Sequence, residues 1–359
     1  MSDKLKYQYI PDVVSPPGAT LLDILEERGI TQAELAARTG RPRKTINEII
    51  KGKSAISPET AIQLETVLGV SAAFWNNRES AYRAFLARRA EDVRLKEQVG
   101  WVREVPYASM SRLGWVPPAS KPIERVRALL AFYAVATRDD WKRVALNPQV
   151  SYRRSSTLSA DSTALSAWLR QGEIESARIS CRPYDRDAFR TVLADARSLT
   201  TDPPEKFVPI LTSKFPSCGV AITFVPELPG LGVWGATRWT SPTRALIQLS
   251  LRYKSDDHLW FTLFHEAGHI LLHGKREVFV ESQGAESREE DEANRFAADH
   301  LIPAEAFRQF REQAPFGSTK IKSFASMLGI APGIVVGRLQ HERLITFRDF
   351  NQLKRRFVW

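Results

Sequence analysis

The sequence predicts a mainly helical protein of the α+β class. Three observations support this. Residues 20–99 contain closely spaced start and stop signals for helices. After Pro204 the apolar period changes, and short runs of β-branched and aromatic residues alternate with Pro and Gly. Further along, His265-Glu266-Ala-Gly-His269 lies inside an apolar stretch that suits a buried helix.

Composition and charge restrict the class of protein. The chain has 359 residues, of which 43% are hydrophobic and 26% charged, and these are ordinary globular values. A chain of this length predicts two or three domains. Cys181 and Cys218 are its only cysteines, which excludes a disulfide framework and a four-cysteine zinc site. The net charge of +10 is spread along the chain and permits an anionic partner such as nucleic acid.

Targeting signals are not recognised in the sequence. No apolar run approaches the roughly 18 residues that a membrane span requires. Residues 1–10 alternate charge with tyrosine and lack the apolar core of a signal peptide. We therefore expect a cytoplasmic protein with no membrane partner.

Five helices are predicted between residues 20 and 99. Their starts are marked by residues that cap helices or suit a first turn: Thr20, Thr31 in a capping box with Glu34, Pro42, Ser57 and Ser71. The second and third helices are joined around Gly40, and they have the length and turn of a helix-turn-helix.

The third of these helices, Pro42–Lys51, is the one expected to enter the major groove of DNA. Ile46, Ile49 and Ile50 form its inward stripe, which leaves the polar side chains on the opposite face. Arg and Lys suit guanine, Asn suits adenine, and amides and cations suit phosphate. The candidate DNA-binding residues are Gln32, Arg41, Arg43, Lys44, Thr45, Asn47, Lys51 and Lys53. Spacing alone fits a helical bundle with a solvated basic edge equally well.

A resemblance favours DNA binding. The segments "TQAELA", "INEIIKGK" and "ISPETAIQLETVLGVSAAFW" are similar to the phage-repressor-type (Xre) helix-turn-helix family, and most similar to antitoxin repressors of the HigA type. The resemblance covers roughly 75 residues and implies a five-helix repressor domain that binds operator DNA as a homodimer. The stretch Arg41-Pro-Arg-Lys44 is more basic than the small hydroxyl residues usual in the family, so the operator sequence does not transfer.

Three strands are predicted after Pro204, at Gly219–Val225, Val233–Arg238 and Arg244–Leu251. Short turns at 228–232 and 240–242 predict a small antiparallel sheet in which these strands follow one another. If Val233–Arg238 lies at the edge of this sheet, it could bind an extended substrate by strand addition.

The histidines of His265-Glu266-Ala-Gly-His269 predict a metal site. Residues i and i+4 of a helix lie on one face about 6 Å apart along the axis, so both rings can reach one Zn²⁺ ion. Glu266 lies beside a ligand, where its carboxylate can take a proton from a water molecule. Gly268 leaves room for another element to approach closely. The alternative is a buried helix whose histidines only bond to backbone carbonyls.

A third ligand is expected from the acidic helix that begins near Glu286. Several carboxylates there compete, and those at its start also suit the positive end of the helix dipole. Glu290 and Asn294 are i, i+4, so Asn294 shares a face with Glu290 and could orient a histidine. His273 continues the series from His265, but it is about 12 Å away along the helix, too far to share the ion comfortably.

A second resemblance assigns these positions. The segments "FTLFHEAGHILLH" and "EEDEANRFAADHLIP", with the preceding "WGATRW" and "ALIQLSL", are similar to the ImmA/IrrE family of metallo-endopeptidases. The resemblance implies a zincin-like fold, zinc bound by His265, His269 and Glu290, and Glu266 as catalytic base. Where family members have Glu-Leu or a similar pair, this chain has Asp299-His300, which makes His300 a candidate near the site. His258, Tyr253 and Arg238 are further candidates for stabilising an oxyanion.

These observations divide the chain into residues 1–99, a DNA-binding domain; residues 100–205, a helical region without a chemical motif; and residues 206–359, a peptidase domain with a helical tail. Phe324–Ile330 and Val335–Leu339 in that tail resemble a second small helix-turn-helix, but their apolar spacing favours packing.

Together they predict an antitoxin-like or repressor-like regulator whose zinc-dependent endopeptidase domain cleaves a regulator or the chain itself in response to a signal. The alternative is a non-proteolytic antitoxin-type repressor whose peptidase-like domain senses a ligand or binds a toxin. The expected partners are operator DNA, a protein substrate or toxin, and a second copy of the chain.

Overall fold

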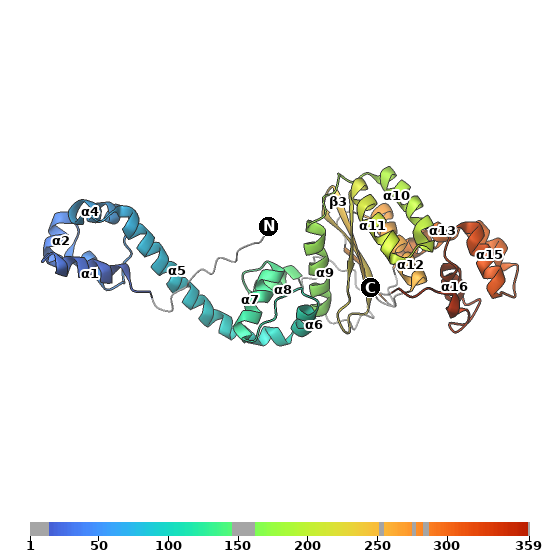
Figure 1. The fold of residues 1–359 in the computed structure, drawn as a ribbon, viewed down its shortest axis with the longest axis horizontal. Coiled ribbons are helices and arrows are strands. Elements are labelled where there is room, and N and C mark those ends of the chain that lie inside the picture. The colour runs from blue at the N-terminus through green and yellow to red at the C-terminus, as the bar shows by residue number, and fades with distance from the viewer. Residues whose placement is uncertain (1–13, 146–161, 251–254, 275–277, 283–286, 358–359) are drawn as a thin grey trace. The chain divides into compact units, whose positions relative to one another are not determined.

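The computed structural model describes residues 14–145, 162–250, 255–274, 278–282 and 287–357. The chain forms two compact units, residues 1–97 and residues 98–359. Each unit has a hydrophobic core of its own. The chain is mainly helical with one small sheet, so the predicted fold class is confirmed (Figure 1).

The first unit contains the five predicted helices. They are α1 (Pro17–Glu27), α2 (Gln32–Thr39), α3 (Arg43–Ile50), α4 (Pro58–Leu68) and α5 (Ala72–Glu97). The predicted caps at Thr31, Ser57 and Ser71 are present, because each hydroxyl accepts a bond from the backbone N–H three residues later. The predicted start at Thr20 is wrong: α1 begins at Pro17, whose fixed φ suits a first turn.

The capping box at the start of α2 is only half formed. Thr31 Oγ1 accepts from the backbone N–H of Glu34 at 3.1 Å. The Glu34 carboxylate accepts from Arg38 Nη2 one turn further along instead of reaching back to the helix start. An i, i+4 ion pair on the exposed face therefore replaces the second bond of the motif.

The core of the first unit holds α3 in place. Ile46 and Ile49 are buried and Ile50 is partly buried, as the inward stripe predicted. Gly18 of α1 lies against the last turn of α3, where a Cβ atom would be 2.1 Å from the backbone oxygen of Ile49. Only glycine permits so close an approach of two helix backbones, so this contact with α1 determines the position of α3 in the bundle.

The second unit begins with helices from the middle of the chain. The α-helices are α6 (Tyr107–Arg112), α7 (Pro122–Tyr133), α8 (Arg138–Ala145), α9 (Ser162–Ala177), α10 (Arg186–Ser198) and α11 (Pro204–Lys214), and the short 3₁₀ helices are η1 (Val99–Arg103), η3 (Leu199–Thr201) and η4 (Phe215–Cys218). Trp101, Tyr133 and Trp141 pack together as an aromatic cluster among the first of these. The predicted break at residues 147–148 lies outside the described residues.

The sheet is mixed, so the prediction of an antiparallel sheet is wrong. Its strands are β1 (Val220–Val225), β2 (Val233–Ser241), β3 (Arg244–Ser250) and β4 (Val278–Ser282), in the order β1-β3-β2-β4. β2 and β3 form the predicted hairpin, with Thr237 opposite Ile247, whereas β1 runs parallel to β3. The reason is visible in burial: β1 and β3 are covered on both faces along almost their whole length, which is typical of parallel pairs.

β2 lies inside the sheet, between β3 and β4, and not at an edge as we hypothesised for strand addition. β4 pairs with it antiparallel, with Ala236 opposite Val280. This fourth strand was not predicted from the sequence. It forms the edge beside β2, and β1 forms the other edge.

Helices cover both faces of this sheet. α9 lies on one face, where Trp168 Nε1 donates to the carbonyl of Val225 and Gln248 Nε2 donates to the carbonyl of Trp168. α10, α11 and α12 (Asp256–Leu272) lie on the opposite side of the sheet in Figure 1. Thr237 Oγ1 of β2 donates to the carbonyl of Glu266 on α12, which fixes that helix against the sheet.

The rest of the second unit packs around α12. It comprises α13 (Arg288–Leu301), α14 (Ala304–Arg311), α15 (Ser318–Leu328), α16 (Pro332–His341) and the 3₁₀ helix η5 (Asn351–Leu353). Val335, Val336 and Leu339 of α16 are buried in the same core as α12, so the tail packs on the domain as its apolar spacing predicted. Among the described residues, no single helix is long and apolar enough to cross a membrane; α15 and α16 meet that test only as a pair, bent by 113°.

Lys354 and Arg355, near the end of the chain, bind the start of α12. The backbone carbonyl of Arg355 accepts from the N–H of Asp256, and the Arg355 guanidinium donates to the carbonyls of Thr200 and Thr201. Lys354 Nζ pairs with Asp257 at 2.6 Å. Asp256 is fully buried, and α16 reaches it because Gly333 has no side chain: a Cβ there would be 2.2 Å from Asp256 Oδ1.

The buried carboxyl group of Asp256 makes a pH-dependent contribution to stability. Burial, with a smaller contribution from Asp257, raises the pKa of Asp256 from 3.8 to about 6. Between these two values the folded protein holds the proton more tightly than the unfolded chain, so stability falls as the pH rises from 4 to 6. We expect this loss to reach about 3 kcal/mol, and Asp256→Asn should remove it. Urea unfolding of the metal-free wild type and of metal-free Asp256→Asn at pH 4 and pH 7 measures this loss of stability. An equal change of stability with pH in the two proteins would contradict the prediction.

Candidate functional site

The centre of the second unit is built on α12, which packs against one face of the sheet. His265, Glu266 and His269 face inward and are almost completely buried, at 1%, 0% and 1% exposed. Their neighbours Leu263, Phe264 and Ala267 belong to the apolar core, so the helix has no solvent face here. Polar side chains so deeply buried require polar or ionic partners.

One partner of the two histidines comes from α13. Glu290 Oε2 lies 3.2 Å from His265 Nε2, Glu290 Oε1 lies 3.5 Å from His269 Nε2, and the two Nε2 atoms are 3.0 Å apart. These atoms form a group of possible metal donors with all three residues buried. The three ligands that the sequence predicted are therefore brought together.

The separations fit a zinc ion. Two donors that each lie about 2.0–2.1 Å from a tetrahedral Zn²⁺ are about 3.3 Å apart. Here the two imidazole nitrogens are 3.0 Å apart, and each lies 3.2 or 3.5 Å from a different oxygen of the Glu290 carboxylate. The donor set, two imidazole nitrogens and one carboxylate, is also the set that zinc hydrolases use with a fourth position left for water. Among the described residues, the site thus offers the number, type and spacing of donors that zinc requires.

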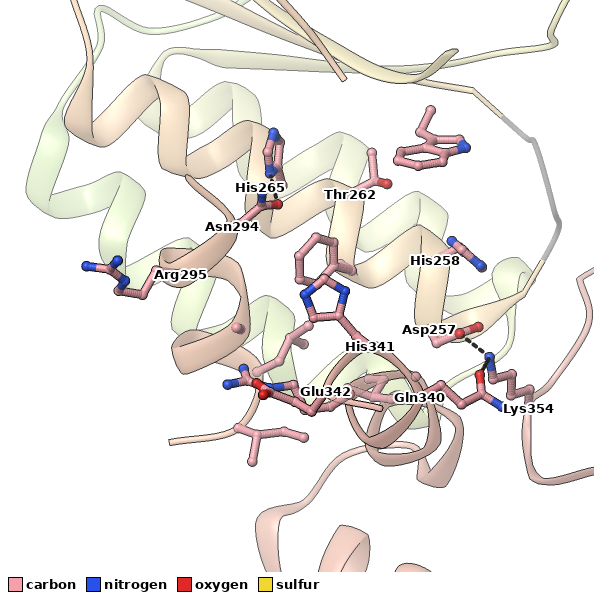
Figure 2. A pocket seen from close by; sticks show the side chains of 18 of the residues that line it. Asp257, His258, Thr262, His265, Asn294, Arg295, Gln340, His341, Glu342 and Lys354 are labelled. Carbon is pink, nitrogen blue, oxygen red and sulfur yellow. Dashed lines mark hydrogen bonds and ion pairs between the residues drawn. The ribbon is translucent and has the colours of Figure 1, made fainter. Parts of the chain in front are cut away.

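The neighbours of His265 favour a ring whose Nε2 is directed at this centre. His265 Nδ1 lies 3.0 Å from Asn294 Oδ1, a contact that Figure 2 shows. Because an amide oxygen accepts, Nδ1 carries the proton, and Nε2 keeps its lone pair for a metal. Burial lowers the pKa of His269 to about 2, so this ring is neutral.

Close packing of α12 and α13 brings Glu290 within reach. A Cβ atom at Gly268 would lie 3.2 Å from Ala293 Cα of α13. The expectation that Gly268 admits a close neighbour is thus confirmed, and the neighbour is α13. Ser287 Oγ accepts from the N–H of Glu290 at 3.2 Å, which fixes the first turn of α13 and the position of Glu290 within it.

Glu266 lies on the side of α12 that faces β2. A Cβ atom at Gly235 of β2 would be 2.6 Å from Glu266 Oε1 and 2.7 Å from Thr262 Cγ2. The space for the Glu266 carboxylate therefore exists because residue 235 has no side chain. Gly235 was not singled out from the sequence, although a glycine inside a strand is a known signal for the close approach of another group.

A pocket of about 480 Å³ adjoins two of the three donor residues, His265 and Glu290, and is lined mainly by α12, α13, α16 and the segment after α16 (Figure 2). His265, Glu290 and Asn294 contribute to its lining. Much of the remaining wall is apolar, contributed by Trp234, Phe261, Ala298, Leu301, Ile302, Ile334 and Phe347. The charged side chains include Arg295, Arg338, Glu342, Asp257 and Lys354, of which the last two pair with each other.

The other candidates from the sequence occupy different places. His300 does not join the centre: its Nε2 bonds the carbonyl of Leu193 on α10 at 3.3 Å, and its ring packs on Phe264. Arg238 pairs with Glu173 of α9 and has a structural role on the other face of the sheet. His258 lines the pocket. Tyr253 lies outside the described residues.

The candidate DNA-binding residues occupy the start of α3 and its surroundings. Arg43 and Lys44 form the exposed first turn, and Thr45 and Asn47 follow with partly exposed side chains. Gln32 begins α2, and Lys51 and Lys53 are exposed after α3. Arg41 is held in place, since its Nε donates to Gln63 Oε1 at 2.6 Å. The bundle thus brings these residues to the two helices that a helix-turn-helix uses.

Two protein-family models match this chain, one in each compact unit. The helix-turn-helix family model matches residues 21–75, and the model of the IrrE N-terminal-like domain matches residues 233–331. The latter range contains all three metal donors and Glu266.

Comparison with individual proteins finds relatives of the first unit. The uncharacterized HTH-type transcriptional regulator YddM of Escherichia coli is 32% identical over 77 residues, which are 21% of this chain and 82% of YddM. Virulence-associated protein A of Dichelobacter nodosus is 39% identical over 16% of this chain and 58% of its own length.

Solved structures similar to this unit include PA4674 of Pseudomonas aeruginosa in complex with its operator DNA. That protein is 30% identical over 24% of this chain and 94% of its own, with a TM-score of 0.23. The HigA-family antidote protein of Coxiella burnetii is 23% identical over 23% of this chain and 91% of its own, with a TM-score of 0.22.

The fold and the site therefore define a two-part protein, a helix-turn-helix domain followed by a metallopeptidase-like domain. The chain belongs to the Xre-like helix-turn-helix family of regulators, and it carries an IrrE/ImmA-like domain in its second unit.

Proposed function

We propose that this protein is a DNA-binding regulator joined to a zinc-dependent endopeptidase, which cleaves a regulator or the chain itself in response to a signal. One observation carries the enzymatic half: His265, His269 and Glu290 present buried donor atoms at the spacing of a metal site, and Glu266, which follows His265 in the sequence, is buried on the same helix. The match to the IrrE N-terminal-like family supports the same conclusion.

The chain's own residues supply the proton transfers of peptide hydrolysis. A zinc ion held by the three donors would lower the pKa of a water molecule and polarise the scissile carbonyl. Glu266 takes the proton that the water loses as its oxygen attacks the carbonyl carbon. The same carboxyl group then gives this proton to the leaving nitrogen as the C–N bond breaks. Burial of Glu266 against β2 keeps its carboxylate in one position through both transfers.

The pocket supports a polypeptide substrate with a large apolar side chain next to the scissile bond. Its lining includes His265 and Glu290 together with the apolar side chains of Phe261, Leu301 and Ile334. Its volume of about 480 Å³ accommodates one aromatic or branched side chain together with adjoining backbone.

The first unit supports the regulatory half. Arg43, Lys44 and Asn47 lie at or near the start of α3, and we propose that Lys51 and Lys53, which are exposed after it, contact phosphate. The match of residues 21–75 to the helix-turn-helix family model supports the same role. We propose that this chain binds an operator through α3, as a homodimer, and that a protein partner of the toxin or repressor class is regulated or cleaved.

Metal analysis combined with mass spectrometry tests the enzymatic half. Purified protein should contain about one zinc per chain, and incubation should yield fragments of the chain or of the protein encoded beside it. Metal without any fragment would instead favour a non-proteolytic repressor whose second unit senses a ligand or binds a partner.

Gly235→Ala should impair cleavage without loss of metal. The new Cβ would displace the Glu266 carboxylate, and a shift of about 1 Å at a catalytic group costs roughly 10²-fold in rate. Zinc content should stay at the wild-type level because the atoms nearest to the new Cβ belong to Glu266 and Thr262, not to the three donors. Gly317→Ala, where the new methyl group meets no atom within 4 Å, is the matched control. A Gly235→Ala protein that cleaves at the wild-type rate would show that Glu266 does not need this space.

A further inference from the structure

His273, directly after the last turn of α12, contacts a metal donor without belonging to the donor set. Its Nδ1 lies 2.9 Å from His269 Nδ1, on the side of that ring away from Glu290. Its Nε2 lies 3.3 Å from Glu292 Oε2 of α13, and its side chain is only 6% exposed. Arg288 Nε donates to the other oxygen of Glu292 at 2.8 Å. A continuous chain of contacts thus leads from the surface to His269.

The chemistry of these groups fixes where the protons are. A carboxylate only accepts hydrogen bonds, so His273 Nε2 must carry the proton that it shares with Glu292. A neutral imidazole has one N–H group, so His273 Nδ1 is then an acceptor. His269 Nδ1 must therefore donate to it, and the lone pair of His269 then lies on Nε2. That atom is the one that faces His265 and Glu290.

We propose that Glu292 and His273 are positioning residues for the metal centre: they fix the tautomer and the ring orientation of His269 so that its Nε2 lone pair faces the metal. The inference rests on the proposed function only in requiring that the centre binds a metal ion.

The two histidine ligands are thereby oriented in different ways by one helix. Asn294 of α13 bonds His265 directly at 3.0 Å, whereas Glu292 of α13 acts on His269 through His273. Glu290 of the same helix is the third donor. The acidic start of α13 thus contributes a ligand and one half of the orientation, and Arg288 holds the Glu292 carboxylate through its hydrogen bond of 2.8 Å.

NMR of the metal-free full-length protein with ¹⁵N-labelled histidine tests the tautomer directly. In the wild type, His269 should carry its proton on Nδ1. In His273→Leu, which removes the acceptor, the Nε2–H form of His269 should appear. A wild-type spectrum in which His269 Nε2 carries the proton would overturn the proposal.

Zinc affinity, measured by competition with a chromophoric chelator, tests the consequence. His273→Leu should raise the zinc Kd by roughly 10–100-fold, the usual cost of losing a group that orients a ligand. His273→Gln should recover part of the affinity because its amide oxygen can accept from His269. Glu292→Gln should raise the Kd as well, whereas Asp291→Asn, an equal loss of charge at an exposed position of the same helix, should not.

A zinc Kd that stays within about threefold of wild type in both His273→Leu and Glu292→Gln would overturn the proposal, as would an equal effect of Asp291→Asn. If His273→Leu does not fold, Glu292→Gln, which alters a side chain 37% exposed, carries the affinity test together with the wild-type spectrum. A protein that binds zinc and shows the expected tautomer but cleaves no peptide would contradict the proposed function and leave this inference intact.

Discussion

Glu266→Gln is expected to lower the rate of peptide cleavage by 10²- to 10⁴-fold, the usual contribution of a general base, while zinc stays bound. The amide of glutamine matches the carboxylate in size but cannot take a proton from water. The metal should remain because His265, His269 and Glu290 form the donor set without Glu266. Mass spectrometry of fragments over time, with metal analysis of the same samples, measures both quantities.

The control for this experiment is Glu312→Gln, which makes the same chemical change at an exposed position after α14. It should leave the rate and the metal content unchanged. If Glu266→Gln cleaves as fast as wild type, Glu266 is not the base and any fragments in the preparation come from another protease. If the variant loses its zinc, Glu266 helps to hold the metal and the assignment of ligands needs revision.

The double variant Arg43→Ala, Lys44→Ala is expected to weaken operator binding by roughly 10²-fold or more. Each specific bond to a base is worth about 1–3 kcal/mol of binding free energy. Removing a cation that contacts a phosphate also reduces the slope of log K against log salt concentration by about one. Both side chains are exposed in the first turn of α3, and alanine preserves that helix. Titration of labelled operator DNA at several salt concentrations gives the affinity and the slope together.

The matched control for DNA binding is Arg311→Ala, Lys322→Ala, which removes the same charge from exposed positions of the second unit. A general electrostatic attraction would weaken equally in both double variants. A specific helix-turn-helix interaction should weaken only when the residues of α3 are changed. Equal losses of affinity would therefore contradict the assignment of α3 as the recognition helix.

Local signals in the sequence were sufficient for much of the fold. The hydroxyl caps at Thr31 and Ser57, the apolar stripe of α3 and the positions of β1, β2 and β3 follow from interactions within a few residues. Such interactions are readable because they depend on spacing along the chain and not on distant partners. The start of α1 was misplaced for a related reason, since both Pro17 and Thr20 suit a helix start.

Pairing between strands could not be read in the same way. A continuous apolar strand is compatible with parallel and antiparallel neighbours, so short turns suggested an antiparallel sheet where β1 instead lies parallel to β3. Likewise, β2 has the composition of an edge or an inner strand, and only the pairing with β4 decides that it lies inside.

The candidate metal centre also has a part that the sequence predicts and a part that only the tertiary structure decides. His265, Glu266 and His269 lie on one helix, so their mutual geometry follows from helical spacing alone, and Glu290 and Asn294 share a face of another helix for the same reason. What the amino-acid sequence could not determine is which side chains of separate elements meet. Gly235 makes room for Glu266, Glu292 reaches His269 through His273, and His300 turns away toward α10, because contacts between elements are set by the packing of the whole unit.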